Sequence, residues 1–247
     1  MSDQSGTISR VKEMIEESAR IVVMLGVGTV IESGGENLWS SRECYRIEGI
    51  YHKSPDEMMS VGYYSARRDK FFDFYKKEIL GRKLEPASLY ADVKRLQDSG
   101  RVLKIITQNY FNLPGRTGLK DVVELHGNII RNHCTRCGKE FPAEYIREAK
   151  GIVPLCDKCN APIRPGILLF GEKIHNDLMT EAVNACEEAD LVLVLGTNMY
   201  DSMVKYCSAN YKGDRLVLIT RDEHYTDRYA DFVIHGKVSD MLPLIIE

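Results

Sequence analysis

Residues 21–28 read IVVMLGVG, and this stretch decides the fold class. Its first five residues form a continuous apolar run, which predicts a strand buried on both faces of a parallel sheet. Gly26 and Gly28 follow the strand at once, and glycines there allow backbone amides to approach a phosphate closely. The dinucleotide-binding fingerprint has a third glycine where this chain has Ile31, so the pattern alone fits either a phosphate-binding loop or a plain tight turn.

Further apolar runs of strand length alternate with helical stretches along the chain. The predicted strands occupy residues 102–107, 190–197, 215–220 and 232–236. Helices are expected over 7–20, from about residue 85, over 176–189, near 202–211 and at the C-terminus. This alternation predicts an α/β fold with a doubly wound, Rossmann-type parallel sheet. Ligands bind such sheets beyond the carboxyl ends of the strands, which here are residues 26–29, 107–109, 196–198 and 219–220.

Two segments interrupt the alternation and predict a small second lobe. Residues 54–80 read as a long amphipathic helical run, in which Ser54 can cap the helix and Pro55 suits its first turn. Residues 131–165 hold paired cysteines and show little periodicity. We therefore expect a Rossmann-type domain of residues 1–30, 86–130 and 166–247, with a small lobe made of a helical insert (31–85) and a zinc-binding module (131–165).

The paired cysteines predict one structural zinc ion, bound by Cys134, Cys137, Cys156 and Cys159. Each CxxC turn directs two thiolates at a single ion, and two such turns complete a tetrahedral shell. Gly138 and Asn160 follow the two pairs, and both residue types suit a tight backbone. Four thiolates leave no open coordination position, so we expect this zinc to support shape rather than chemistry.

Composition narrows the class of protein. The chain has 247 residues, 44% of them apolar, which suits a globular protein with a substantial core. A net charge of −3 gives no basic footprint for nucleic acid, and no apolar run approaches the roughly 18 residues of a membrane helix. The polar N-terminus shows no secretory signal, so a cytoplasmic protein with no membrane partner is expected. In a reducing compartment the isolated cysteines are expected to be buried thiols: Cys44, Cys186 and Cys207.

Several stretches resemble, in order, motifs of the sirtuin (Sir2) family of NAD-dependent protein-lysine deacylases. IVVMLGVGTVIESGG (21–35) resembles the family's GAGxSxxSGIP loop, and TQNYFNLPGRTG (107–118) resembles TQNIDGLHxxAG. The other matching stretches are VVELHGN (122–128), the two CxxC pairs, RPGILLFGE (164–172), LVLVLGTN (191–198) and FVIHGKVSDMLP (232–243). The resemblance covers residues 9–245 and implies a Rossmann core with a small lobe of helical insert and zinc ribbon.

The resemblance also implies a reaction. NAD would lie between the lobes, the acyl-lysine carbonyl oxygen would attack the nicotinamide ribose, and nicotinamide and an O-acyl-ADP-ribose would leave. His126 matches the general base, with Asn109 as a second catalytic residue. The implied cofactor-binding residues are Gly26, Val27, Gly28, Thr29, Gln108, Asn109, Gly196, Thr197, Asn198, Thr220 and Val238. The implied acyl-lysine and peptide contacts are Ile167, Leu168, Phe170, Gly171 and Glu172. Read without the resemblance, His126 also fits a structural histidine at a strand end.

The chain departs from the family pattern where the nicotinamide should bind. The family's PDFR is Glu36-Asn37-Leu38-Trp39, so an aspartate becomes an amide and an arginine becomes an indole that cannot bind a phosphate or carboxylate by charge. The aspartate of TQNID, which the resemblance assigns to the nicotinamide carboxamide, becomes Phe111. Losing one buried, charged hydrogen bond costs about 1.5–3 kcal/mol, so several losses at one site could abolish productive binding. A Tyr-x-x-Arg pair for acidic acyl groups is absent too, because Glu78 stands three residues after Tyr75.

Three functions remain open on the sequence. The first is an NAD-dependent protein-lysine deacylase acting on an acyl-lysine protein or peptide. The second is an impaired module of the same scaffold that binds NAD or ADP-ribose without turnover, favoured by Asn37, Trp39 and Phe111. The third is ADP-ribosyl transfer or NAD hydrolysis, which no residue positively selects.

Overall fold

A parallel six-stranded sheet, in the order β3-β2-β1-β7-β8-β9, forms the centre of the larger lobe in the part of the chain that the structure describes. The structure is a computed structural model that describes residues 4–246, so the predicted domain's outermost residues, 1–3 and 247, lie outside it. The strands are β1 (Ile21–Leu25), β2 (Val102–Thr107), β3 (Val122–Glu124), β7 (Leu191–Leu195), β8 (Leu216–Thr220) and β9 (Phe232–His235). The predicted doubly wound sheet is confirmed, with its switch point between β1 and β7.

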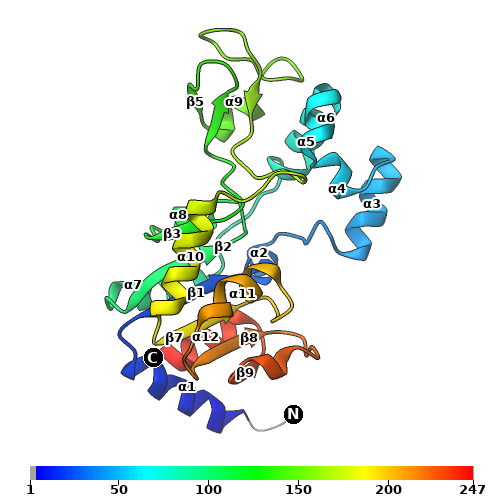
Figure 1. Cartoon of the computed structure of the whole chain (residues 1–247). Coiled ribbons are helices and arrows are strands. Elements are labelled where there is room, and N and C mark those ends of the chain that lie inside the picture. Colours follow the sequence, from blue (N-terminus) through cyan, green and yellow to red (C-terminus); the bar gives the residue numbers. More distant parts are fainter. Residues whose placement is uncertain (1–3, 247) are drawn as a thin grey trace.

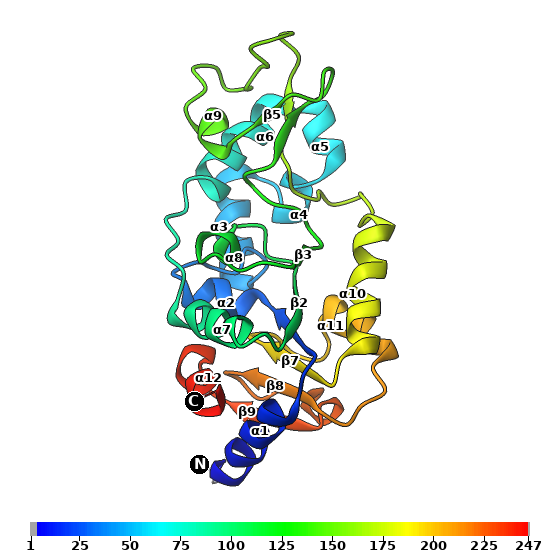
Figure 2. The ribbon, with the colours of Figure 1, turned by 90° about the vertical axis from the view of Figure 1, so that its left-hand side faces the viewer.

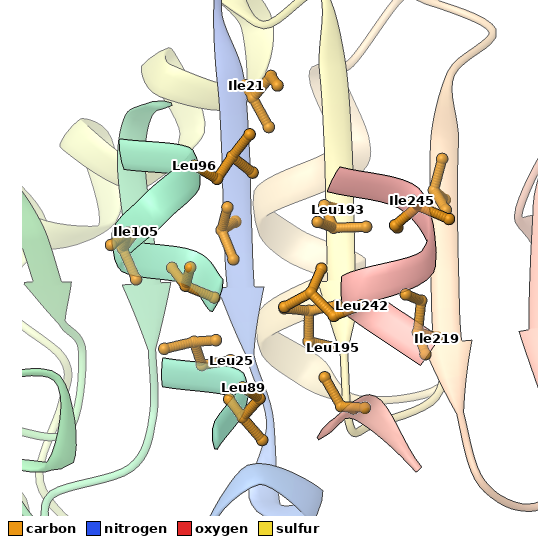
Figure 3. Close-up of a cluster of buried hydrophobic side chains, with 14 of the residues drawn as sticks. Ile21, Leu25, Leu89, Leu96, Ile105, Leu193, Leu195, Ile219, Leu242 and Ile245 are labelled. Atoms are coloured by element: carbon orange, nitrogen blue, oxygen red, sulfur yellow. The ribbon is translucent and has the colours of Figure 1, made fainter. Parts of the chain in front are cut away.

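Helices cover both faces of this sheet, as Figures 1 and 2 show. They are α1 (Ser5–Glu17), α2 (Val27–Glu32), α7 (Ser88–Asp98), α8 (Leu113–Arg116), α10 (Asn176–Glu188), α11 (Ser202–Cys207) and α12 (Val238–Ile246), with short 3₁₀ turns η2 (Ser208–Asn210) and η3 (Asp227–Tyr229). Helices α1, α7 and α12 cover one face, and Figure 3 shows Leu89, Leu96 and Leu242 packed there against the strands. Helices α10 and α11 cover the other face.

The central strand β1 explains why the first stretch decides the fold. Ile21, Val23 and Leu25 pack in the core under α1, α7 and α12, whereas Val22 and Met24 pack in the core under α10 and α11. All five side chains are fully buried. A strand with cores on both sides must be apolar at every position, and this produces a continuous apolar run instead of an alternating one.

Strand β3 is the one strand of this sheet, among the described residues, that lies outside the apolar runs from which the strands were predicted. It has three residues, Val122–Glu124, and pairs with the end of β2 through Ile105, Ile106 and Thr107. Three residues are too few to show a periodic pattern, so its position depends on pairing with β2. The strand matters for the site because His126 follows it by two residues.

The helical insert is a series of short segments, where the sequence predicted one long run over 54–80. The segments are α3 (Ser41–Tyr51), α4 (Pro55–Met58), α5 (Val61–Ala66), α6 (Arg68–Phe74) and a π-helical turn η1 (Tyr75–Ile79). The predicted start is confirmed: Ser54 Oγ accepts from Glu57 N at 3.2 Å and Pro55 occupies the first turn. The break between α4 and α5 has a tertiary cause. The Phe170 N–H donates to the Met59 carbonyl and the Phe170 carbonyl accepts from Val61 N–H, both at 3.0 Å.

The zinc-binding module is a three-stranded antiparallel sheet in the order β5-β4-β6, among the described residues, with helix α9 (Ala143–Arg147) beside it. Its strands are β4 (Asn132–Cys134), β5 (Glu140–Phe141) and β6 (Ile163–Arg164). Phe71 and Phe74 of the insert share one buried cluster with Phe141 and Ile163 of the module. The insert and the module thus make a single small lobe, which stands above the larger lobe in Figure 1. The predicted domain boundaries stay a prediction.

None of the helices within residues 4–246 has the length and hydrophobicity needed to cross a membrane.

Candidate active site and metal centre

The loop after β1 is packed directly onto the end of β7. Gly26 N–H donates to the Leu195 carbonyl at 2.9 Å, and Gly28 N–H donates to the Gly196 carbonyl at 2.7 Å. A Cβ at position 26 would lie 2.3 Å from Thr197 Cβ, and one at position 28 would lie 2.6 Å from the Gly196 oxygen. The two glycines are therefore required by the packing of the loop on β7. The N–H groups of Gly26 and Gly28 are themselves used in these bonds, and the predicted phosphate contact of the loop stays a prediction.

A first cavity of about 750 Å³ opens beyond the ends of β1, β7 and β8. Seven of the predicted cofactor-binding residues line it: Val27, Gly28, Gly196, Thr197, Asn198, Thr220 and Val238. Residues that the sequence did not select also line it, among them Glu32, Arg221, Lys237 and Ser239. The cavity offers hydroxyl and backbone groups that can hydrogen-bond a nucleotide. Its basic lining residues are Lys237 and Arg221, of which Arg221 is paired with Asp222 at 3.0 Å, and four carboxylates line it too: Glu32, Asp222, Glu223 and Asp240.

Glu32 joins α2 to α12 at the wall of the first cavity. Its carboxylate accepts from Val238 N at 2.7 Å, from Ser239 N at 2.9 Å and from Ser239 Oγ at 2.5 Å. These amides begin α12, so the carboxylate caps that helix and fixes the approach of Val238 to the cavity. A single glutamate 206 positions away in the sequence gives no local signal of this contact.

A second cavity of about 530 Å³ lies beside the first, and Val27 lines both. It gathers the predicted residues Gly26, Gln108, Asn109, His126, Leu168, Phe170, Gly171 and Glu172. The departures Asn37, Trp39 and Phe111 line the same cavity. The carboxyl ends of β1, β2 and β3 and the chain returning from the metal module thus meet at one hollow.

Two predicted residues lie outside both cavities. Thr29 is fully buried, and its Oγ1 donates to the Gly26 carbonyl at 2.8 Å and accepts from Tyr90 Oη at 3.1 Å. Ile167 is 2% exposed and bridges to Gly127 through the backbone. Both positions support the walls of the site from behind in this structure.

His126 sits in the second cavity with its backbone fixed and its ring half-buried. Its carbonyl accepts from Leu168 N–H at 2.8 Å, which joins the end of β3 to the segment 167–172. Burial lowers the pKa of the imidazole from its ordinary 6.5, and the Asp201 carboxylate offsets part of that shift. The ring is therefore mainly neutral at pH 7, the form that can accept a proton.

Asn109 and Gln108 hold the loops around the same cavity. Asn109 Nδ2 donates to the Gly26 carbonyl at 2.8 Å and to the Leu25 carbonyl at 3.2 Å, which locks the end of β2 to the loop after β1. Gln108 Nε2 donates to Ser202 Oγ at 3.2 Å and so reaches toward α11.

The segment 167–172 is held by an ion pair behind it. Arg164 Nη2 lies 2.6 Å from Glu172 Oε2, and the same carboxylate oxygen accepts from Leu169 N at 2.7 Å. This arrangement turns the chain so that Phe170, 44% exposed, faces the cavity.

Phe111, where the family has an aspartate, forms part of the cavity wall. Its ring centroid lies 4.6 Å from that of Tyr110, and it contacts the apolar cores of both lobes. The ring is thus a packed element of the junction between the lobes and offers no hydrogen-bond acceptor to a ligand.

The four predicted zinc ligands converge in the small lobe. The Sγ atoms of Cys134, Cys137, Cys156 and Cys159 all lie within 4.8 Å of one another. Tetrahedral zinc with Zn–S bonds of about 2.3 Å separates its sulfurs by about 3.8 Å, and two of the Sγ pairs lie 3.3 and 3.7 Å apart. The amides of Arg136 and Cys137 point at Cys134 Sγ from 3.4 Å, as expected around a thiolate. The residues fit a structural zinc ion.

Backbone geometry bears out the reading of the two residues that follow the cysteine pairs. Gly138 has φ of 68° and Asn160 has φ of 58°, both in the left-handed region that tight turns require. Of the isolated cysteines, Cys186 and Cys207 are fully buried as predicted, and burial raises the pKa of Cys186 to about 12. The prediction is wrong for Cys44, which is half-buried because the buried positions of α3 are Glu43 and Ile47.

Comparisons with known proteins agree with the motifs. The Sir2 family model matches residues 10–201. An NAD-dependent protein deacetylase of Clostridium tetani is 34% identical over 245 residues, covering 98% of each chain, and one of Clostridium acetobutylicum is 31% identical, covering 97% of this chain and 98% of its own. Among solved structures, one described as "The Structural basis of Sirtuin Substrate Affinity" has a TM-score of 0.85 at 27% identity, covering 100% of this chain and 98% of its own. Another, described as "Sir2-p53 peptide-NAD+", has a TM-score of 0.82 at 26% identity and covers 97% of both chains. The chain belongs to the Sir2 family.

Proposed function

We propose that this protein is an NAD-dependent protein-lysine deacylase. The observation that carries the proposal is the junction of the two cavities at Val27, with His126 and the segment 167–172 around the second of them. A dinucleotide spanning the junction would place its adenosine in the first cavity and its nicotinamide riboside beside His126. Relatives that match this chain over nearly their whole length are named NAD-dependent protein deacetylases.

Each of these residues has a separate role in the proposed reaction. The acyl-lysine arm enters beside Leu168 and Phe170, and its carbonyl oxygen displaces nicotinamide from the ribose of NAD. His126, neutral at pH 7, accepts the proton of a ribose hydroxyl as that hydroxyl attacks the acyl carbon. Asn109 keeps the loop after β1 in place through its bonds to the Leu25 and Gly26 carbonyls. With one water consumed, the products are free lysine, nicotinamide and O-acyl-ADP-ribose.

A nicotinamide-release assay tests the proposal. The purified protein is incubated with NAD, with and without an acetyl-lysine peptide, and released nicotinamide is quantified. Release should depend on the peptide and should fall about 10²-fold or more in His126→Ala, the usual range for loss of a general base. His175→Ala is the matched control, because His175 is exposed and lies outside both cavities. Release without peptide would point to NAD hydrolysis or ADP-ribosyl transfer and would overturn the deacylase.

A second candidate is a nucleotide-binding module without turnover. It is favoured by Phe111 and Trp39, which give the second cavity aromatic walls where the family has an aspartate and an arginine. This candidate predicts that calorimetry detects binding of NAD or ADP-ribose, with ADP-ribose preferred, while nicotinamide release stays at background with every acyl-peptide. Peptide-dependent release that His126→Ala abolishes would exclude it.

A further inference from the structure

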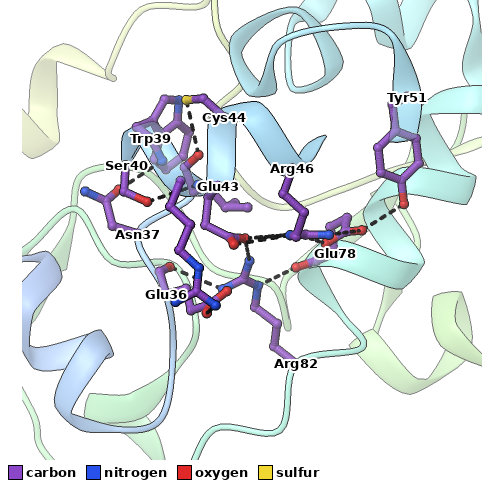
Figure 4. A network of polar contacts seen from close by, with 12 residues as sticks. Glu36, Asn37, Trp39, Ser40, Glu43, Cys44, Arg46, Tyr51, Glu78 and Arg82 are labelled. Atoms are coloured by element: carbon purple, nitrogen blue, oxygen red, sulfur yellow. Dashed lines mark hydrogen bonds and ion pairs between the residues drawn. The ribbon is translucent and has the colours of Figure 1, made fainter. Parts of the chain in front are cut away.

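Trp39 is the single tryptophan of the chain, and three bonds and contacts fix it at the rim of the second cavity. Its backbone N–H donates to Asn37 Oδ1 at 3.0 Å, which closes a tight turn in the loop between α2 and α3 (Figure 4). Its indole Nε1 donates to Asp56 Oδ1 of α4 at 2.5 Å. The ring is therefore held in one orientation by its own loop and by helix α4, while 39% of the residue remains exposed.

Phe170 faces Trp39 from the chain that returns from the metal module. The two ring centroids lie 5.7 Å apart with the planes tilted by 49°. Phe170 is fixed through its backbone, since its N–H and carbonyl are both bonded to the chain around Ser60. The two rings form a rigid aromatic wall that stays open to the cavity. Large aromatic surfaces left exposed at a cavity are typical of places where an apolar group packs.

The carboxylates outnumber basic groups among the residues that line this cavity. Among the described residues that line the second cavity, the carboxylates are Glu36, Asp56, Glu172 and Asp201, and none of the lining residues is a lysine or arginine. Glu172 is paired with Arg164, and Asp201 accepts from Met203 N and Thr197 Oγ1. Glu36 lies 4.0 Å from Arg42, whose side chain is 86% exposed, so Glu36 and Asp56 leave negative charge at the rim.

We infer that Trp39 is a substrate-binding residue, and that its apolar ring together with the acidic groups beside it selects uncharged acyl groups. The lysine methylenes and the acyl chain pack against the wall made by Trp39 and Phe170, and the carboxylates of Glu36 and Asp56 reject acyl groups that end in a carboxylate. Trp39 stands where the family has an arginine that can bind the cofactor, and in this chain the residue at that position contacts the acyl chain instead. The inference rests on the proposed function for the identity of the substrate, but binding itself needs no turnover.

Fluorescence of Trp39 tests the inference without catalysis, because no other tryptophan contributes to the signal. Three peptides that differ only in the acyl group on one lysine are titrated, in the presence and absence of ADP-ribose: acetyl, butyryl and succinyl. Butyryl and succinyl have the same carbon count and differ in a terminal methyl or carboxylate. Butyryl should shift the emission and bind at least tenfold more tightly than succinyl. It should also bind more tightly than acetyl, by up to about fourfold for each methylene buried.

Variants measured by calorimetry separate the ring from the charge. Trp39→Ala should weaken butyryl-peptide binding about tenfold, whereas Trp39→Phe should retain most of it. Asp56→Asn, alone and with Glu36→Gln, should narrow the preference for butyryl over succinyl. Tyr45→Ala is the matched control in the same lobe, since Tyr45 is 76% exposed on α3 and lines neither cavity. Thermal melts of each variant check that the small lobe is folded.

The outcomes distinguish this inference from the proposed function. Equal affinity for butyryl and succinyl, or a Trp39→Ala variant that binds as well as Tyr45→Ala, overturns the inference even where nicotinamide release is normal. The expected binding preferences without nicotinamide release uphold the inference and overturn the deacylase. A protein that binds none of the peptides, with or without ADP-ribose, overturns both.

Discussion

At the scale of single residues, His126 shows how burial changes the pKa of a side chain that the sequence had already identified as a candidate base. The half-buried imidazole lines the second cavity, and desolvation disfavours its charged form. Asp201 acts in the opposite direction, so the two effects can be separated by substitution.

The pH profile should report this balance. A general base works in its neutral form, so kcat/KM should rise with pH and level off as His126 loses its proton. Because the pKa is lowered from 6.5, more than half of the plateau rate should remain at pH 6.5. Asp201→Asn, which removes the raising influence, should move the acid limb to still lower pH. A midpoint above pH 6.5 in the unmodified protein would contradict the assignment of His126 as a buried base.

Glu43 illustrates a charge that the small lobe depends on. It is 2% exposed on α3 and forms an ion pair with Arg46 at 2.9 Å, and Arg46 also reaches Glu78 of η1 at 2.6 Å (Figure 4). Glu78, the residue that stands where an arginine would read an acidic acyl group, therefore points into this network and not into the second cavity.

Removing this carboxylate should destabilise the protein. Glu43→Ala leaves Arg46 with one partner fewer and should lower the free energy of unfolding by about 2 kcal/mol or more, measured by urea denaturation. Glu48→Ala, an exposed position on the same helix, is the control. The Arg46 guanidinium lowers the pKa of Glu43 below its ordinary 4.5, so this stabilisation is complete above pH 4.5 and is lost as the pH falls below it. Equal stability of the two variants at pH 7 would show that the pair contributes nothing.

At the scale of elements, the two chain segments that connect the metal module to the larger lobe are joined at glycines. Asn128 N–H donates to the Gly166 carbonyl at 2.9 Å, and Gly166 N–H donates to Asn132 Oδ1 at 3.0 Å. Gly127 has φ of 71°, which only a glycine adopts without strain. This junction of the two segments places His126 immediately before one glycine and the segment 167–172 immediately after the other.

Gly166→Ala should disrupt this junction of the two segments. Its Cβ would lie 2.0 Å from the Arg131 carbonyl oxygen, so backbone must move. We expect a melting temperature lower by several degrees and a weaker peptide affinity. Gly151→Ala, in a loop of the metal module where the nearest atom is 3.5 Å away, should melt as the unsubstituted protein does. Identical melting of the two variants would mean that the junction of the two segments tolerates a side chain.

At the scale of the whole molecule, the metal module is fused to the helical insert by a shared core. Phe141 and Ile163 pack with the phenylalanines of α6, and the insert in turn carries Trp39 and Asp56 to the second cavity. A zinc ion held by the four cysteines would therefore support the site through the packing of the small lobe, whereas the parallel sheet has cores of its own.

Metal removal should affect the small lobe and leave the larger lobe folded. We expect one zinc ion per chain by atomic emission, and its loss on chelation or in Cys137→Ala. Acyl-peptide binding should then fall sharply while the far-ultraviolet circular dichroism of the sheet and its helices is largely retained. Cys44→Ser should keep the full zinc content, because Cys44 lies outside the four-cysteine cluster. Unchanged peptide binding after zinc loss would show that the module does not support the site.

The fold and the metal ligands were predictable because their signals are local. A strand buried on both faces must be apolar throughout, so the runs IVVML and LVLVL predict β1 and β7. Each CxxC turn places two sulfur atoms close together within four residues of sequence, and the two turns supply all four ligands. The motifs around His126 and residues 167–172 likewise carry the resemblance to the Sir2 family in the sequence itself.

Tertiary structure alone decided how those parts form a site. Three features of the site each join residues far apart in the sequence. They are the two cavities that meet at Val27, the aromatic wall of Trp39 and Phe170, and the capping of α12 by Glu32. The insert breaks at Ser60 because its backbone pairs with Phe170, although the local pattern favours one long helix. Local patterns record which face of an element is buried, but they do not record which distant segment covers it, and the chemistry of this site depends on that second fact.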